Sequence, residues 1–421
     1  MMRWALIAML ALFTRSAHAQ TADVAASESE VVGENYTEPA SESGTVEEGV
    51  SPSPAAVETE TATETPTESL HFVWTPGGEA PPDTTQDLHP SRGVSWAFEP
   101  GMHVIGEYAL SVPDGSDWFH EFRLPRAWAW LGFRFENARA RVLLEGAQGS
   151  GAGSLFGVAG DSVVLRVREA WVGYRAWDLL EIRAGLVPTL TPSALTQLWG
   201  MRAVSQDGLR QFDLMAPADL GATLALDIPD GWGRIAAAYY NGDGYTSREL
   251  NRGKTLEAFA QLHPLRFVSE LAPLTLTLSY QNGSVGTGSA RADRFMGGLA
   301  WDDPRWGLGA QASWIGGIAD RGDREGLLLD AWARVEPVER LLIAVRAMSF
   351  LRNLGGGTDR ITVLTGAIGG RIVEPLRAFL AFDGHLADDA AQLADPGTRG
   401  WTLRVIVEGV FSGHFEGLVT P

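Results

Sequence analysis

The chain has 421 residues, with 33 basic and 52 acidic side chains, 15 tryptophans and no cysteine, and its formal net charge is −19. This acidic balance argues against nucleic acid as a partner, because phosphate binding needs a basic face. The absence of cysteine excludes disulfides, zinc–thiolate sites, iron–sulfur clusters, lipoprotein acylation and cysteine nucleophiles.

The first ninety residues differ in character from the rest. Residues 1–19 are predicted to be a secretory signal peptide, because Arg3 precedes an apolar stretch and Ala17-His18-Ala19 forms a small-x-small cleavage pattern. Residues 20–90 contain fifteen acids and no Lys or Arg. Such a segment cannot bury enough surface to offset its ordering entropy, so we predict a disordered, acidic, Glu/Thr/Ser/Pro-rich tether. The alternative is an acidic arm that binds a basic partner.

Residues 91–421 are dominated by a hydropathy period of two. Over 137–147, for example, Arg139, Arg141 and Glu145 share one face, and the intervening residues are mostly apolar. Apolar residues facing lipid, polar residues facing water and aromatics near the strand ends are typical of a transmembrane antiparallel β-barrel. A soluble β-sandwich shows the same alternation. Export without lipidation, strands of about ten residues and many tryptophans favour the all-β membrane barrel.

About sixteen segments carry this pattern, and an even number suits a bacterial outer-membrane barrel. The predicted strands are 101–110, 122–135, 137–147, 162–174, 179–187, 219–228, 231–240, 254–264, 272–282, 292–302, 305–315, 326–336, 339–350, 359–369, 374–383 and 399–411. Tight turns alternate with longer loops rich in Gly, Asp and Ser. This asymmetry predicts short periplasmic turns, and it places both chain ends, including the tether, in the periplasm.

The third long connection, residues 188–218, is much longer than the other predicted loops and is rich in apolar side chains. A loop of this length is usually functional or disordered, and this one must pack on something. In a barrel the available place is the lumen, where the loop would narrow the pore. The charged residues predicted to line that constriction are Arg202, Asp207, Arg210 and Asp213. The alternative is an external loop packed on its neighbours.

Several segments, in order, resemble the phosphate-selective porin O/P family. Phe122–Gln148 resembles the family's early Arg-rich hairpin, and Leu165–Pro188 resembles the hairpin that precedes its long loop. Ala216–Tyr245 and Leu256–Leu265 resemble the strands that follow. The resemblance covers about 91–421 and implies a sixteen-stranded, often trimeric outer-membrane porin with a third loop folded into the lumen. The chain has a single lysine, Lys254, and no counterpart of the family's lysine cluster, so no phosphate-binding residue is carried over.

The lumen wall is predicted to be rich in arginine. The wall residues singled out are Arg139, Arg141, Glu145, Arg166, Arg168, Glu181, Arg183, Arg334, Arg346 and Arg404. Charged rings in a pore bias selectivity by sign, so the arginine excess predicts a weak preference for anions. The alternative is that these residues pair across strands and merely hold a solvated wall.

No catalytic, cofactor or metal motif is found. The glycine-rich run Gly149–Ser154 lacks the lysine of a phosphate loop, and Asn241–Gly244 lacks the distal glutamate of an EF-hand. The chain is therefore expected to be a porin for small hydrophilic solutes and ions, with outer-membrane lipid around it, and not an enzyme. The alternative function is a non-conducting outer-membrane barrel with a structural or binding role.

Overall fold

The computed structural model describes residues 71–74, 94–115, 117–149, 162–246, 253–285, 290–318, 321–356, 359–394 and 399–419. The expected signal peptide lies outside these residues. Of the expected tether, only β1 (His71–Trp74) is described. Within the described ranges, no helix is both long and apolar enough to span a membrane.

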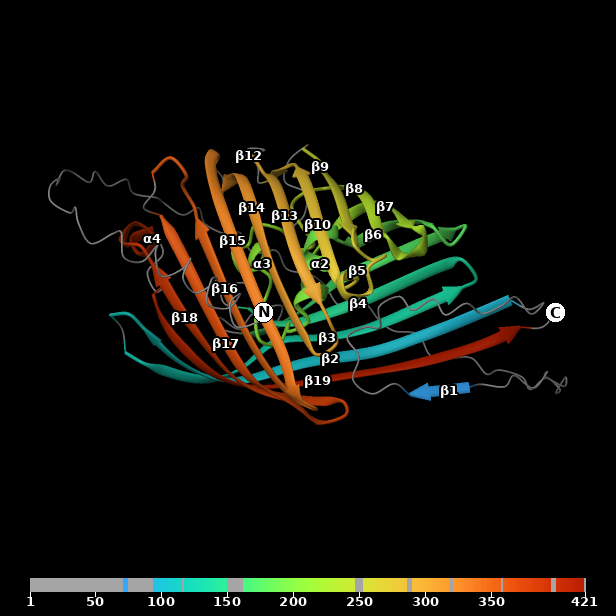
Figure 1. Cartoon of the computed structure of the whole chain (residues 1–421), viewed down its shortest axis with the longest axis horizontal. Coiled ribbons are helices and arrows are strands. Elements are labelled where there is room, and N and C mark those ends of the chain that lie inside the picture. The colour runs from blue at the N-terminus through green and yellow to red at the C-terminus, as the bar shows by residue number, and fades with distance from the viewer. Residues whose placement is uncertain are drawn as a thin grey trace, which may run out of the picture. The chain divides into compact units, whose positions relative to one another are not determined.

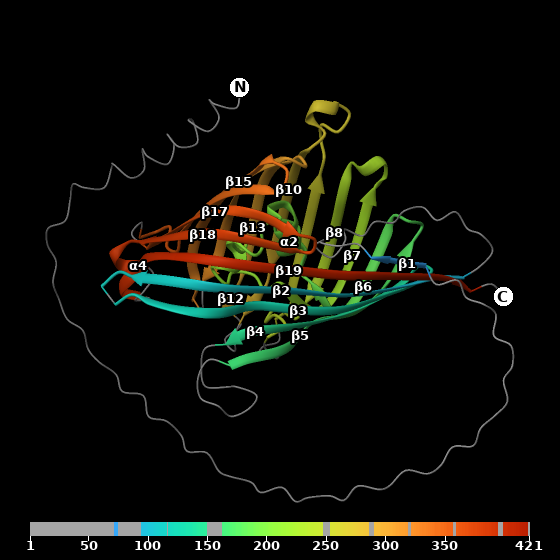
Figure 2. The same ribbon diagram turned by 90° about the horizontal axis from the view of Figure 1, so that it is seen from below.

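Sixteen antiparallel strands form a closed barrel (Figures 1 and 2). Each strand pairs with the next, and β19 pairs with β2 to close the ring. The strands are β2 (Val94–Pro113), β3 (Phe119–Phe135), β4 (Ala138–Gly149), β5 (Ser162–Ala176), β6 (Leu180–Pro188), β7 (Ala218–Ile228), β8 (Gly233–Tyr240), β9 (Thr255–Leu262), β10 (Leu274–Asn282), β13 (Asp293–Asp302), β14 (Trp306–Ile318), β15 (Arg321–Val338), β16 (Leu341–Leu351), β17 (Arg360–Val373), β18 (Leu376–Ala387) and β19 (Gly400–Val419). The predicted number and order of strands are confirmed.

The two faces of the barrel differ in chemistry, as the alternation predicts. On β3, Leu131, Phe133 and Phe135 point outward and are 46%, 55% and 56% exposed. On the neighbouring strand β4, the charged residues Arg139 and Glu145 point inward, and Glu145 is buried. An apolar outer surface and a polar lumen suit a barrel that is surrounded by lipid.

The tight turns at one end of the barrel contain residues with left-handed backbone. Glu136, Trp177, Asp178, Asp230 and Arg340 have φ between 51° and 73°. Positive φ lets a short turn match the right-handed twist of the strands that it joins. The short connections therefore follow from local turn geometry as well as from hydropathy.

The barrel wall is taller around β19 and β2 than the sequence predicts, so the expected end of the last strand at Phe411 is wrong. Strand β19 continues to Val419, and its last five residues pair with Val94–Phe98 of β2. Its residues Gly413–Glu416 also pair with β1. The apolar alternation fades here, but Phe98 packs against Phe133 and Phe415, with ring centroids 5.0 and 5.9 Å away. Such cross-strand aromatic pairs stabilise a sheet.

The long connection between β6 and β7 folds into the lumen, as predicted, and is called the lumen loop (residues 189–217). It contains the helices α2 (Leu190–Trp199) and α3 (Gly208–Gln211), which lie within the ring of strands in Figure 1. The remaining short elements are η1 (Pro229–Gly231), η2 (Ser269–Leu271), β11 (Ser284–Val285), β12 (Ala290–Arg291) and α4 (Asp389–Ala394).

Candidate functional site

The lumen loop is anchored to the wall by carboxylates placed at the starts of its two helices. The fully buried Glu257 of β9 accepts hydrogen bonds from the backbone N–H of Leu190 at 3.1 Å and of Thr191 at 2.9 Å. It also accepts from the Thr191 hydroxyl at 2.6 Å and from Tyr240 at 3.1 Å. A carboxylate at a helix N-terminus satisfies amides that have no partner within the helix.

The second anchor is Asp330 of β15. Its Oδ2 atom accepts from the backbone N–H of Gly208, at the start of α3, at 3.1 Å. Arg346 of β16 donates to both oxygens of Asp330, at 2.9 and 2.5 Å, and both side chains are buried. This bidentate pair fixes the carboxylate that holds the second helix of the loop.

Apolar packing holds the lumen loop against the wall formed by β13 to β16. Leu195, Leu209, Leu214 and Met215 of the loop form one buried cluster with wall residues Met296, Ile315, Ile318, Leu328 and Phe350. Trp199, at the end of α2, packs on Trp332 with ring centroids 5.6 Å apart. Met201, Ala203 and Val204 of the loop belong to a second buried cluster, with Ile105, Trp128 and Ile406 of the wall formed by β2, β3 and β19. The loop therefore crosses the lumen and contacts both sides of it.

A cavity of about 300 Å³ remains between the loop and the wall of β2, β3 and β17 to β19. Five arginines line it, against two carboxylates: Arg123, Arg126, Arg202, Arg210 and Arg404, with Glu107 and Asp383. Arg404 pairs with both carboxylates, at 3.2 Å from Glu107 and 2.6 Å from Asp383. Arg123 pairs with Glu121 at 2.5 Å, and Arg126 pairs with Glu145 at 3.0 Å. Arg202 and Arg210 are thus the lining arginines without an ion pair among the described residues.

Glu145 and Trp128 organise the basic side of the cavity. Oε1 of Glu145 accepts hydrogen bonds from Arg126 at 3.0 Å, Trp128 at 3.1 Å and Arg168 at 3.2 Å. Its Oε2 accepts from the hydroxyl of Tyr245. The guanidinium of Arg202 lies over the Trp128 ring, 4.1 Å from the ring centroid. One carboxylate and one indole thus hold three arginines in place.

Burial shifts the pKa values of the loop arginines at the cavity toward the neutral form. Burial, and next the nearby Arg168 and Arg210, lowers the pKa of Arg202 well below its ordinary value. Burial likewise lowers the pKa of Arg210 to about 10. Arg210 therefore remains protonated at neutral pH. Desolvated cations that lie close to other cations favour an anion between them.

The structure places Arg202 and Arg210 on the cavity and the two aspartates of the loop elsewhere. Asp207 is buried at the start of α3, where its carboxylate accepts from the backbone N–H of Arg210 at 3.2 Å. Burial raises the pKa of Asp207. Asp213 lies just after α3 with a φ of 51°. Neither lines this cavity: Asp207 is a buried helix cap, and Asp213 is an exposed turn residue whose place at the constriction stays a prediction.

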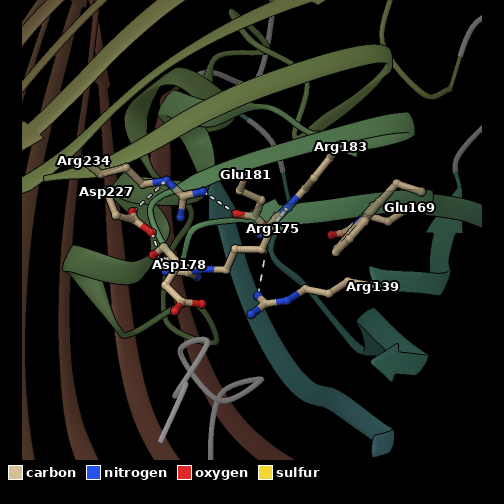
Figure 3. A network of polar contacts seen from close by, with 9 residues as sticks. Arg139, Glu169, Arg175, Asp178, Glu181, Arg183, Asp227 and Arg234 are labelled. Carbon is tan, nitrogen blue, oxygen red and sulfur yellow. Dashed lines mark hydrogen bonds and ion pairs between the residues drawn. The ribbon is translucent and has the colours of Figure 1, made fainter. Parts of the chain in front are cut away.

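Figure 3 shows how other wall residues surround Glu181 of β6. Its carboxylate pairs with Arg183 at 2.7 Å, with Arg234 at 2.5 Å and with Arg139 at 3.8 Å. Arg141 lies 3.5 Å from Glu169. This part of the wall has the cross-strand pairing that was the alternative to anion selectivity, although arginines outnumber the carboxylates that they meet.

The remaining wall residues also lie on the lumen side. Arg166 is opposite Glu145 in the strand register, and Arg168 occupies a β-bulge between β4 and β5. Arg334 pairs with Asp302. Arg404 donates at 2.6 Å to the backbone carbonyl of Val204 and so links the tip of the lumen loop to β19.

Arg123 and Arg126 are cavity residues that the sequence pattern did not single out. They are three positions apart, so simple alternation puts them on opposite faces. A bulge places Leu124 and Pro125 opposite Gly106 and brings both arginines to the lumen. Proline within a strand is itself a sign of a bulge, and this signal could have identified the pair.

No metal centre is found in the described part of the chain, where no group of three or more His, Asp or Glu residues is placed to hold a metal ion. The turn Asn241–Gly244 is instead held by Asp219, whose carboxylate accepts from the Gly242 N–H at 2.8 Å. Most of the glycine-rich run Gly149–Ser154 lies outside the described residues.

Solved outer-membrane channels share this fold. The anion-selective porin from Comamonas acidovorans is 15% identical with a TM-score of 0.54, covering 75% of this chain and 100% of that one. OmpF of Salmonella typhi, in complex with daunomycin, is 13% identical with a TM-score of 0.53, covering 75% and 97%. The channel DcaP of Acinetobacter baumannii is 9% identical with a TM-score of 0.50, covering 77% and 99%. The fold is therefore that of the outer-membrane porins. No protein-family model and no curated protein matches the sequence.

Proposed function

We propose that this chain is an outer-membrane porin through which small hydrophilic solutes and ions diffuse passively, with a preference for anions. The observation that carries the proposal is the cavity beside the lumen loop, which five arginines line against two carboxylates. Arginine stays charged over the physiological pH range, so it presents a fixed positive potential to passing ions. The likeness in fold to the anion-selective porin from Comamonas acidovorans supports the same function. The proposal assigns the chain no catalytic activity.

The cellular setting is part of the proposal. Residues 1–19 direct export, the barrel lies in the outer membrane, and the acidic segment 20–90 extends into the periplasm. The ordered motifs that resemble the phosphate-selective porin O/P family support a distant relationship to that family. The same resemblance supports assembly as a homotrimer.

One observation favours a second candidate, a non-conducting barrel with a binding or structural role. Arg404 ties the carbonyl of Val204 to the wall, so the loop tip touches the side opposite its main packing surface. A loop held on both sides could obstruct the lumen.

Single-channel recording in a planar bilayer distinguishes the two functions. The porin proposal expects stable conductance steps and, in a salt gradient, a reversal potential of the sign given by anion preference. Steps with a cation-selective reversal potential would contradict the anion preference alone. Absence of steps, from protein that migrates as a heat-modifiable folded barrel, would contradict the porin function and support the second candidate.

A further inference from the structure

The cavity in the lumen has the composition of a binding site, and its basic side is preorganised. Arg126 and Arg168 are oriented by Glu145, and Arg202 is stacked on Trp128. Because Glu145 already accepts four donors, it is fully engaged by the groups that hold it. The arginines retain donors beyond those that Glu145 accepts, since each guanidinium carries five N–H groups.

Arg202 lines the cavity and has no ion pair among the described residues. Its buried Nη2 atom also has no hydrogen-bond partner there. The neighbouring Arg210 donates to a neutral acceptor, Oε1 of Gln206, at 2.9 Å. A guanidinium that lies beside other cations without a carboxylate partner would be stabilised by an oxyanion in the cavity that it lines. The lowered pKa of both arginines has the same cause, because burial and like charge disfavour the cationic form.

The rest of the cavity surface is partly apolar, which suits an organic molecule better than an inorganic ion. Ile105, Val204 and Val363 line it beside the arginines, and Thr365 and Thr402 line it beside the Arg404 ion pairs. A hydrocarbon body would cover these apolar side chains, whereas a hydrated inorganic ion would leave them in water. A second negative charge at the far side would meet Glu107 and Asp383. The cavity of about 300 Å³ is large enough for a small organic molecule.

We infer that this cavity is a saturable binding site for small organic monocarboxylates, with the carboxylate on Arg202, Arg126 and Arg210 and the hydrocarbon body against Ile105, Val204 and Val363. The inference rests on the proposed function, because it assigns a solute class to the same pore. Arginine can bind a carboxylate through two parallel hydrogen bonds, and Trp128 holds the Arg202 fork in a fixed plane. Binding at this site slows the passage of such a solute through the pore, beyond the general attraction of anions by positive charge.

The test uses the folded full-length barrel and two independent readouts. Butyrate and benzoate are titrated into a chloride-conducting channel, and the same probes are titrated calorimetrically into detergent-solubilised protein. We expect saturable block and saturable binding, with both carboxylates binding more tightly than inorganic phosphate. The variant Arg202→Gln should weaken the binding of both probes at least about tenfold, because it removes a charge-assisted bidentate contact. Arg202→Lys should recover only part of this loss.

The matched control is Arg340→Gln, which removes one positive charge from an exposed turn outside the cavity. Its block and binding curves should equal those of the wild type. Equal or tighter binding of inorganic phosphate would overturn the carboxylate assignment, and unsaturable block would overturn the site itself. Binding without any conductance steps would contradict the porin function and leave the site standing. A folded Arg202→Gln variant with unchanged binding would overturn the role of Arg202.

Discussion

Arg202 of the lumen loop and Trp128 of the barrel wall form a stacked pair, with the guanidinium carbon 4.1 Å from the centroid of the indole ring. The same indole donates its Nε1–H to Glu145 at 3.1 Å. The position of the loop cation is therefore set by the wall that it faces. The cavity is lined by both the loop and the wall, so under the proposed function a change in either should alter selectivity.

Replacing Trp128 by leucine should reduce anion preference while the barrel still folds. The change removes the stacking surface of Arg202, which in buried sites stabilises by about 2 kcal/mol, and one donor to Glu145. We expect the reversal potential in a salt gradient to move toward the non-selective value. Trp128→Phe is the control, because it keeps a ring under Arg202 and loses only the N–H. An unchanged reversal potential in Trp128→Leu would show that the stacking does not position Arg202.

Replacing Glu257 by alanine should enlarge the conducting pathway. The substitution leaves the amides of Leu190 and Thr191 and the hydroxyl of Tyr240 without their acceptor, at about 1–3 kcal/mol for each buried donor. The start of α2 should then leave the wall, and single-channel conductance should rise. Glu257→Gln, which keeps one acceptor oxygen, should have an intermediate conductance. A wild-type conductance in the alanine variant would mean that apolar packing alone positions the loop.

Replacing Asp207 by asparagine should not reduce stability at neutral pH. In the unfolded chain, the pKa of Asp207 is about 3.9. Burial raises the pKa above this value in the folded protein, so the folded state binds the proton more tightly than the unfolded state does. Protonated Asp207 therefore contributes fully to the free energy of unfolding below about pH 3.9, and this contribution disappears as the pH rises through the folded-state pKa. Asparagine caps a helix equally well and does not titrate.

Urea unfolding followed by tryptophan fluorescence checks this prediction. At pH 7, Asp207→Asn should be at least as stable as the wild type, and the difference should vanish below about pH 4. Asp207→Ala should lose about 1 kcal/mol because it removes the cap. A wild type that is more stable than Asp207→Asn at pH 7 would show that the pairing with Arg210 outweighs the burial of the carboxylate.

A disulfide should form between cysteines at positions 97 and 416. Ala97 of β2 lies directly opposite Glu416 of β19, in the extension beyond the predicted end of the last strand. Residues opposite each other in an antiparallel pair are within reach of a disulfide. The natural chain has no cysteine, so Ala97→Cys/Glu416→Cys gives an unambiguous shift on a non-reducing gel. A cross-link at the same rate in Ala97→Cys/Phe411→Cys, which are not paired, would contradict this register.

The barrel could be predicted from the sequence because lipid and water impose opposite demands on alternate residues of every strand. Residues such as Arg139 and Arg141 therefore indicate their face directly. The rule fails where register changes. The bulge at Leu124–Pro125 brings Arg123 and Arg126 to the same side, and alternation cannot reveal this.

The lumen loop could be located by its length and apolar content, but its internal geometry could not. Asp207 resembles a pore charge in the sequence because nothing marks the start of the four-residue helix that it caps. The pairing of Glu257 with Thr191 joins residues 66 positions apart and depends on the tilt and stagger of the strands. The end of β19 was missed for a similar reason, since its last residues are held by aromatic neighbours and not by a clear apolar alternation.

The anchors of the lumen loop also carry information about the order of assembly. The loop precedes β9 and β15 in the chain, yet Glu257 and Asp330 on those strands hold its two helices. The loop cannot take its place until strands synthesised well after it have joined the sheet. Placement of the loop in the lumen is therefore a late event in biogenesis. In a barrel that lacks β9 or β15, the loop would have no anchor for one of its helices.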